Sequence, residues 1–523
     1  MRGSNVVVGL ALALGAVCAV AGCTEDGLPG QVLGKGLGRN LIVAPGGGAV
    51  AFLLDAAHPD DRTVPDDLVA GDLWLSATGA QAAGMKVGSG VPSLPGVAQF
   101  SAKGEALAYL ADWRFRTGEG VLMLTAPGRK PVQLAEVASA FTWSPVGTAL
   151  AYVSRGRLQV SMTPLTPGKT FTLDGVQTFN WSPDGKLIAA RAPSLAGGKL
   201  MLLELTGGTV RELGPSTDFS FAQDGALAYL GLTGPKGGDR TLSILEPSAK
   251  APRELGRATA FAFSPDLTQL GVLSTDRSPG DAFGDLGVIP RAGGPLRVLG
   301  SRVSEWRFTS KGDLLFLAGY ELSARAGTLM FAPGAGGESR EVGRKKDQPG
   351  HRTQSFQVNA KGDRVLSIVQ KADKRDFKLE LWTQSLTNVD DGKKLDEGVY
   401  GFLITPDGAN LFWKSRCQGL RSCVLFRAPI DGSREPTLVS KDVAGFDLSE
   451  DGKRLLVAHG HKHAARAVDL SLLDAMGPPV DPPVRPFALE VDPGARFVDA
   501  QGKRVVAAKL GAHEPKVVAI ELP

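Results

Sequence analysis

The sequence predicts an all-β protein, a β-propeller built from about eleven four-stranded blades in two tandem or interlocked rings. Three observations predict this fold class. One strand–turn–strand pattern recurs eleven times along the 523-residue chain. Where the copies can be followed they repeat every forty to fifty residues or so, which is about the length of a four-stranded blade. After the N-terminal segment, no stretch shows the sustained 3.6-residue periodicity of a helix.

The clearest copy is the stretch FNWSPDGKLIAA at residues 179–190. Phe179 and Trp181 alternate, so both side chains are expected on one face of a strand. A tight turn follows, in which Pro183 fixes φ, Asp184 bonds the local backbone and Gly185 accepts a positive φ. A second strand, rich in small Ala residues that let neighbouring sheets approach, completes the pattern.

Further strands follow in nearly every copy. A third strand such as LMLL at 200–203 is followed by a Gly/Pro turn and a fourth strand such as VREL at 210–213. The copies begin at Ile42, Ala98, Phe141, Phe179, Phe219, Phe261, Trp306, Phe356, Phe402, Phe446 and Phe497.

These copies resemble the TolB-type, WD-like propeller repeat, which reads roughly W-S-P-D-G-x-x-[IL]-A-[FY]. The resemblance extends over essentially the whole chain after the leader, although only the turns at Gly185 and Gly408 keep Pro-Asp-Gly intact. It implies the fold and says little about function, because propellers serve many roles. TolB carries an extra α/β domain ahead of its propeller. Here the first copy begins at Ile42, so we expect no such domain.

Eleven blades exceed the usual four to eight of a closed ring. We therefore expect a first propeller of about six blades over residues 39–300 and a second of about five over 301–523, with a single very large ring as the alternative. The last copy lacks a fourth strand, while Gln31–Leu33 is a strand-like segment with no blade of its own. We expect this segment, within residues 23–38, to complete the C-terminal blade and close a ring.

The first 22 residues read as a lipoprotein signal peptide. Arg2 precedes an apolar run over 6–20, which ends in Val20-Ala21-Gly22-Cys23. This ending resembles the bacterial lipobox, which implies that Cys23 is lipidated and becomes the N-terminus of a periplasm-facing or surface lipoprotein. Thr24 in place of Asp favours the outer over the inner membrane. A plain secretory signal with a chance Cys is the alternative.

Two further cysteines, Cys417 and Cys423, lie six residues apart. An oxidising compartment and an even number favour a disulfide that ties down a local loop. A two-Cys metal site is the alternative, but no further ligands lie nearby. His459, His461 and His463 have the spacing of a shared strand face and are weak metal candidates, and a polar hairpin tip is the favoured interpretation.

Two other groups of side chains invite a functional interpretation. Six Asp residues between Asp55 and Asp72 lack the arrangement of a calcium loop and favour a solvated loop. Trp74, Trp113, Trp382 and Trp413 could form a ligand platform, but core positions are favoured. Trp143, Trp181 and Trp306 belong to the repeat and are expected in the blade core.

The sequence favours a binding protein over an enzyme. It holds no nucleophile elbow, P-loop or zinc-protease motif, and it predicts no cofactor. Its 58 basic and 54 acidic residues are interspersed, which argues against nucleic acid as a partner. We expect a protein- or polymer-binding scaffold tied to the membrane by its lipid. The alternative is a hydrolase or lyase that acts on an envelope glycan or peptide through carboxylates in a central channel.

Overall fold

The computed structural model describes most of the chain after residue 30. The described residues are 31–35, 39–58, 68–78, 84–147, 149–162, 170–192, 198–233, 239–274, 283–343, 352–370, 379–419, 422–462, 467–477, 488–491, 495–499, 501–509 and 516–522. Their regular structure is β-strands and two short 3-10 helices, η1 (Pro45–Gly47) and η2 (Val389–Asp391). No helix among these residues is both long enough and apolar enough to cross a membrane.

The chain divides into two compact units. Unit 1 comprises Met1–Asp174 and Lys441–Pro523, and unit 2 is the continuous stretch Gly175–Ser440 between them. Residue 300, the expected boundary of the two rings, lies in β24 inside unit 2. The partition into rings over 39–300 and 301–523 stays a prediction.

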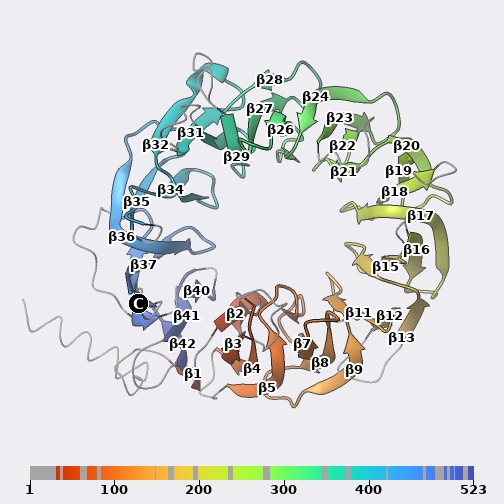
Figure 1. The fold of residues 1–523 in the computed structure, drawn as a ribbon, viewed down its shortest axis with the longest axis horizontal. Helices are drawn as coiled ribbons and strands as arrows, with labels where there is room; N and C mark the ends of the chain where they lie inside the picture. The colour runs from red at the N-terminus through yellow and green to blue at the C-terminus, as the bar shows by residue number, and fades with distance from the viewer. Residues whose placement is uncertain are drawn as a thin grey trace, which may run out of the picture. The chain divides into compact units, whose positions relative to one another are not determined.

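Unit 1 holds five antiparallel four-stranded blades among its described residues (Figure 1). The first three follow one another along the chain: β2 (Arg39–Val43), β3 (Ala49–Ala57), β4 (Ala70–Ala77) and β5 (Met85–Pro92); β6 (Ala98–Phe100), β7 (Leu107–Arg114), β8 (Glu119–Thr125) and β9 (Val132–Ala138); β10 (Ala140–Trp143), β11 (Leu150–Ser154), β12 (Arg157–Ser161) and β13 (Thr170–Asp174). The other two lie near the C-terminus: β36 (Thr437–Leu448), whose residues from 441 belong to this unit, with β37 (Arg454–Lys462), β38 (Ala467–Asp474) and β39 (Ala488–Val491); and β40 (Arg496–Phe497), β41 (Arg504–Lys509) and β42 (Lys516–Glu521) with β1 (Gln31–Lys35).

Strand β1 is the fourth strand of the last blade. It pairs antiparallel with β42, with Gln31 opposite Ala519 and Val32 opposite Val518. Figure 1 shows β1 beside β42. Leu33 is fully buried in a cluster with β3 and with β41 and β42. This is the pairing expected for residues 31–33.

Unit 2 holds six blades among its described residues. The first two are β14 (Thr178–Trp181), β15 (Leu187–Arg191), β16 (Gly198–Glu204) and β17 (Val210–Phe221), and then the second half of β17 with β18 (Leu227–Thr233), β19 (Asp239–Leu245) and β20 (Arg253–Arg257). The third and fourth are β21 (Ala260–Phe263), β22 (Gln269–Ser274), β23 (Gly284–Pro290) and β24 (Arg297–Val303), and then β25 (Trp306–Phe308), β26 (Leu314–Glu321), β27 (Ala326–Ala332) and β28 (Arg340–Glu341). The last two are β29 (Arg352–Val358), β30 (Arg364–Gln370), β31 (Leu379–Ser385) and β32 (Lys393–Glu397), and then β33 (Gly401–Ile404), β34 (Asn410–Ser415) and β35 (Cys423–Pro429) with the start of β36. The all-β fold class and the propeller blade as its repeating unit are therefore confirmed.

The repeated turn explains why each blade begins as it does. In the copy at 179–190, the buried hydroxyl of Ser182 donates to Oδ1 of Asp184 at 2.7 Å and accepts from the backbone N–H of Leu187 at 2.9 Å. Gly185 has a φ of 67°, the left-handed conformation expected of it. The same Ser/Thr–Asp hydrogen bond recurs at Ser264 and Thr405.

Successive blades within a unit pack face to face through apolar clusters. In unit 2, Ala228 and Leu230 of β18 and Ile244 of β19 pack with Leu270 and Val272 of β22, all of them buried. The small Ala side chains recur at such interfaces, as their place in the repeat predicts. Burial of these faces stabilises each sheet only when its neighbour is present.

A basic residue in the fourth strand joins each pair of successive blades in unit 2. Arg211 donates to the carbonyls of Ala249 and Lys250 in the next blade, and Arg297 donates to that of Gly337 at 3.0 Å. The five basic residues with their carbonyl acceptors are Arg211 with Ala249 and Lys250, Arg253 with Arg291, Arg297 with Pro333 and Gly337, Arg340 with Leu386, and Lys393 with Gly432. We call these contacts the inter-blade clamps.

Candidate functional site

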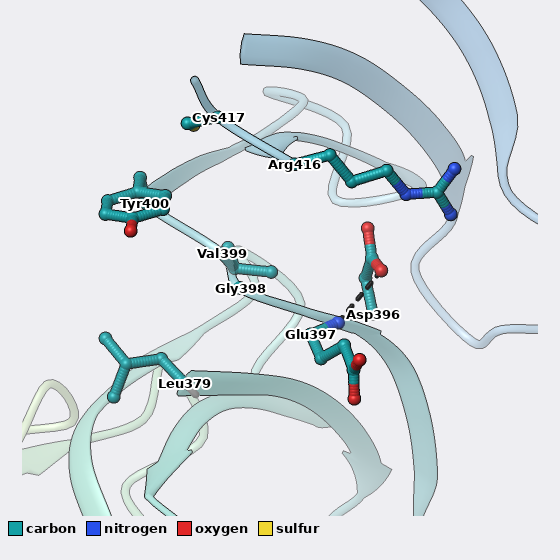
Figure 2. Close-up of a pocket in the computed structure, with 8 residues that line it drawn as sticks. All are labelled: Leu379, Asp396, Glu397, Gly398, Val399, Tyr400, Arg416 and Cys417. Atoms are coloured by element: carbon teal, nitrogen blue, oxygen red, sulfur yellow. Dashed lines mark hydrogen bonds between the residues drawn. The ribbon is translucent and has the colours of Figure 1, made fainter. Parts of the chain in front are cut away.

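A polar pocket lies in unit 2 where β32 leads into β33 (Figure 2). Its volume is about 440 Å³, within the range of small-ligand sites. The start of β31 and the residues just after β34 complete its wall. The lining residues are Leu379, Asp396, Glu397, Gly398, Val399, Tyr400, Arg416 and Cys417. We refer to it as the Tyr400 pocket.

Backbone hydrogen bonds fix the segment that forms the floor of this pocket. The N–H of Gly398, whose φ is 65°, donates to the carbonyl of Leu379 at 2.8 Å. The N–H of Tyr400 donates to the carbonyl of Lys414 at 3.0 Å. Val399 between them is buried, whereas Tyr400 is 57% exposed. The linker is thus held to both blades and presents an aromatic ring to solvent.

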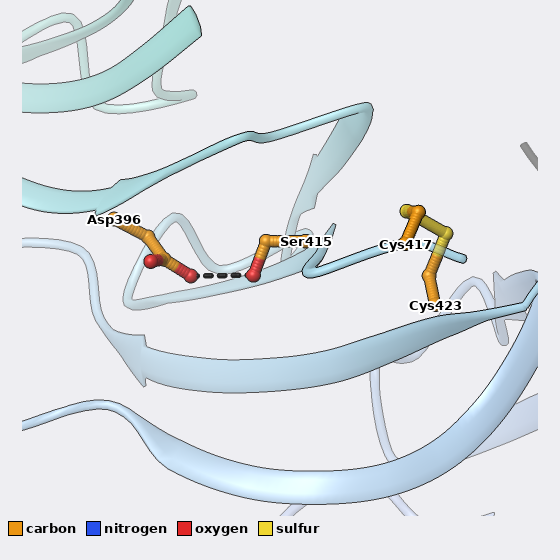
Figure 3. Close-up of a disulfide and its surroundings, with 4 residues drawn as sticks. All are labelled: Asp396, Ser415, Cys417 and Cys423. Atoms are coloured by element: carbon orange, nitrogen blue, oxygen red, sulfur yellow. Dashed lines mark hydrogen bonds between the residues drawn. A yellow bond between two sulfur atoms is a disulfide. The ribbon is translucent and has the colours of Figure 1, made fainter. Parts of the chain in front are cut away.

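Asp396 is the fixed acceptor of the pocket (Figures 2 and 3). Its Oδ2 accepts from the indole Nε1 of Trp413 at 2.8 Å and from the hydroxyl of Ser415 at 2.6 Å. Its Oδ1 accepts from the backbone N–H of Glu397 at 2.9 Å. Three donors therefore hold this carboxylate in one orientation while leaving lone pairs for further donors.

Arg416 is the cation of the pocket. It follows β34 with a φ of 52°, and its guanidinium lies 4.7 Å from the centre of the Phe426 ring. Phe426 in turn stacks on Trp413 at 5.9 Å. Among the described residues, Arg416 has no carboxylate within ion-pair distance and its guanidinium donates no hydrogen bond. An aromatic stack thus positions a charged group whose N–H donors are available.

Lys394 lies at the edge of the acidic side of the pocket. Its Nζ is 3.2 Å from Oε1 of Glu380 and 3.4 Å from Oε2 of Glu397. Burial lowers the pKa of Lys394, but the hydrogen bonds and charges of the two glutamates outweigh burial and raise the pKa overall. Lys394 therefore stays protonated and balances part of the negative charge beside the pocket.

The disulfide between Cys417 and Cys423 borders the same pocket (Figure 3). It closes the loop between β34 and β35, and Cys423 is buried. Residues 420 and 421 of this loop lie outside the described residues. The crosslink restrains Cys417, and with it the neighbouring Arg416, close to β35.

A second cavity, of about 590 Å³, lies in unit 1. Its walls come from the turn after β2, the end of β36 with the turn that follows, and the segment from Phe497 to Gln501. Three acidic residues line it, Asp447, Glu450 and Asp499. Among the described residues, no three His, Cys, Asp or Glu side chains are arranged to hold a metal ion.

The histidine candidates are only partly described. His459 lies in β37 and is 6% exposed, with Nδ1 3.3 Å from the carbonyl of Lys441. Burial lowers the pKa of His459, against smaller raising effects of that hydrogen bond and of Asp442 and Asp469. The side chains of His461 and His463 lie outside the described residues, as does Cys23.

The four tryptophans considered as a ligand platform are buried or half-buried in the structure. Trp413 is fully buried and Trp382 is 3% exposed, so neither forms a surface platform, while Trp74 and Trp113 are half-buried. Sequence reasoning missed the aromatic residue that is exposed at the pocket, Tyr400, and it missed Arg416 and Asp396. The only local signal was the cysteine pair, which adjoins Arg416.

Comparisons with known proteins found similarity to solved structures at low sequence identity. No protein-family model matches the chain, and no curated protein matches it. A eukaryotic initiation factor structure is similar, with 14% identity, a TM-score of 0.41, and coverage of 73% of this chain and 94% of that one. An oligogalacturonate lyase in complex with manganese has 11% identity, a TM-score of 0.31 and coverage of 73% and 96%. A putative TolB from Agrobacterium tumefaciens has 15% identity, a TM-score of 0.25 and coverage of 44% and 84%.

Proposed function

We propose that this protein is a lipoprotein of a bacterial envelope whose propeller blades bind a protein or an envelope polymer. The observation that carries the binding role is the Tyr400 pocket, in which a fixed acceptor, a cation with available donors and an exposed ring surround one cavity. Binding sites commonly combine a preformed cavity with a few placed polar groups.

The location of the protein at the membrane is part of the same proposal. The lipobox-like ending at Cys23 supports lipidation, and the segment from Cys23 to Gln31 is short enough to keep the last blade within about 30 Å of the lipid. Metabolic labelling with a fatty acid tests this in the native chain. Cys23→Ala is expected to abolish both the incorporation of the fatty acid and the recovery of the protein in the membrane fraction. Incorporation that persists in this variant would contradict lipidation at Cys23.

A photo-crosslinking amino acid at position 400 tests the binding role in intact envelopes. We expect a discrete adduct with a protein or a polymer. The same probe at Leu322, an exposed residue of another blade in unit 2, is the matched control and is expected to give no such adduct. Equal labelling at both positions would contradict the proposed site.

The second candidate function is a propeller hydrolase or lyase. The cavity of unit 1 favours it, because carboxylates are the usual acid–base groups of such reactions and three of them line this cavity. Turnover of an envelope glycan or peptide that is lost in Asp499→Asn but kept in Arg416→Gln would support this function over the binding role.

A further inference from the structure

We propose that the Tyr400 pocket binds a glycan segment, with one sugar ring on Tyr400, a sugar oxygen on the guanidinium of Arg416, and sugar hydroxyls on the carboxylates of Asp396 and Glu397. This inference rests on the proposed binding role and gives its ligand a chemical class. No motif in the sequence indicated it.

The hydrogen-bonding groups of the pocket define the ligand. Arg416 can only donate, and the carboxylates of Asp396 and Glu397 can only accept. In Figure 2 the guanidinium of Arg416 and the carboxylate of Asp396 extend toward the same side of the pocket. An anion at Arg416 would meet the repulsion of Asp396, and an ammonium group at Asp396 would meet that of Arg416. Hydroxyl groups satisfy both sides, because each one donates and accepts.

The backbone of the pocket disfavours an extended peptide as the ligand. Peptides that add to a protein as a strand need unpaired main-chain N–H and C=O groups. Here the N–H groups of Gly398 and Val399 donate to Leu379, and that of Tyr400 donates to Lys414. Recognition is therefore left to side chains, which is the mode expected for a ligand with many hydroxyls.

The exposed ring of Tyr400 supplies the apolar part of the contact. A tyrosine that is 57% exposed on a linker fixed by two backbone hydrogen bonds offers a flat surface that loses little freedom on binding. One face of a sugar ring is lined with C–H groups, and stacking on an aromatic ring removes both surfaces from water.

The charged groups near the Tyr400 ring, Asp396 and Arg416, are also held in place before a ligand binds. Trp413 and Ser415 orient Asp396, and Phe426 supports Arg416. Because sugar hydroxyls are well solvated in water, a net gain on binding requires protein groups that are already in place. The buried Trp413 serves both groups, since it donates to Asp396 and carries the stack under Arg416.

Titration calorimetry of the full chain with Cys23→Ala tests the proposal, with the uncharged glycans tetra-N-acetylglucosamine, cellotetraose and maltotetraose as probes. We expect at least one of them to bind. Arg416→Gln and Tyr400→Ala are each expected to weaken its binding by about tenfold, as loss of a hydrogen bond to a charged group or of a stacked ring implies. Tyr400→Phe keeps the ring and is expected to stay within about twofold.

Arg325→Gln is the matched control. Arg325 is exposed, has a φ of 48° and follows the second strand of its blade, as Arg416 does, but lies away from the pocket. It is expected to leave binding unchanged. The glycan proposal is overturned when none of the three probes binds, or when Arg416→Gln binds as well as the parent chain.

The crosslinking experiment separates this proposal from the broader one. A protein adduct at position 400 without binding of any probe would refute the glycan ligand and leave the binding role intact. No adduct and no probe binding would refute both.

Discussion

Arg291 holds Glu246 of the preceding blade through two parallel hydrogen bonds. Its Nε donates to Oε1 at 3.0 Å and its Nη2 donates to Oε2, while Nη1 also reaches Oδ2 of Asp224 at 2.7 Å. The side chain of Arg291 is only 15% exposed. Two carboxylates of one blade thus converge on a guanidinium of the next, next to the inter-blade clamp from Arg253 to the carbonyl of Arg291.

We expect Arg291→Lys to destabilise unit 2 by about 2 kcal/mol, because an ammonium group cannot reproduce a bidentate contact and leaves a half-buried carboxylate poorly paired. Urea unfolding monitored by circular dichroism measures the loss. Arg155→Lys, at an exposed ion pair with Glu136, is the control and is expected to change stability by less than about 0.5 kcal/mol. Equal effects of the two substitutions would contradict the role of Arg291.

Two adjacent glycines of η1 are expected to differ in their tolerance of alanine. Gly46 and Gly47 both have positive φ, 80° and 70°. A Cβ on Gly47 would lie 2.0 Å from the carbonyl oxygen of Val498 in the last blade, whereas one on Gly46 would meet nothing within 4 Å. We expect Gly46→Ala to cost about 1 kcal/mol and Gly47→Ala roughly 3 kcal/mol or more, measured as free energies of unfolding. Similar costs would show that the two blades can separate.

The aspartates of the repeated turn are expected to make the fold sensitive to acid. Hydrogen bonds from Ser264 and Thr268 hold the pKa of Asp266 below its ordinary value. Because the pKa is lowered in the folded chain, the stabilisation is present above the ordinary pKa near 4 and is lost as the pH falls below it. We expect Asp266→Asn to be less stable than the parent at pH 6, and the difference to shrink at pH 3. A difference that is constant with pH would argue against this origin.

His459 is expected to act in a separate pH range. Burial lowers its pKa from 6.5, so the unfolded chain binds a proton more readily than the folded chain. Stability is therefore expected to fall as the pH decreases through about 6.5, and His459→Gln should remove this part of the pH dependence. Melting temperatures of both chains between pH 8 and 5 measure it. The prediction fails if the two profiles stay parallel.

The disulfide is expected to matter more for the pocket than for the fold. The loop between Cys417 and Cys423 is short, so the crosslink contributes roughly 2 kcal/mol at most to stability. We expect the Cys417→Ser, Cys423→Ser double variant to stay folded but to bind the glycan probe more weakly, because Arg416 is then less restrained. Unchanged affinity would show that the stack on Phe426 is sufficient to position Arg416.

Much of the blade could be predicted from the sequence because its signals are local. Trp181 indicates a strand and Gly185 indicates a turn four residues later. A similar spacing between strand and turn recurs in the other copies. The inter-blade clamps could not be predicted from the sequence, although VREL at 210–213 was predicted as a strand. The acceptors of Arg211 are backbone carbonyls nearly forty residues away, and every residue carries a carbonyl.

The Tyr400 pocket was out of reach for a related reason. Tyr400, Asp396 and Arg416 come from a linker, the end of one strand and the start of a loop, and no pair of them forms a recognisable motif. Trp413 is buried and Tyr400 is exposed, and this difference depends on which residues of the preceding blade cover each side chain. The pairing of residues 31–33 could be foreseen, since one blade lacked a strand and one strand lacked a blade.

The strand β1 also orders events during synthesis. It is synthesised before every other described strand, yet its partner β42 is the last of them, so their backbone hydrogen bonds form only after nearly the whole chain has been made. Contacts between such distant segments are slow to form. Until then, the apolar residues that β1 and β42 bury in one cluster stay exposed, and the final blade is where a chaperone or protease would recognise an incompletely folded molecule.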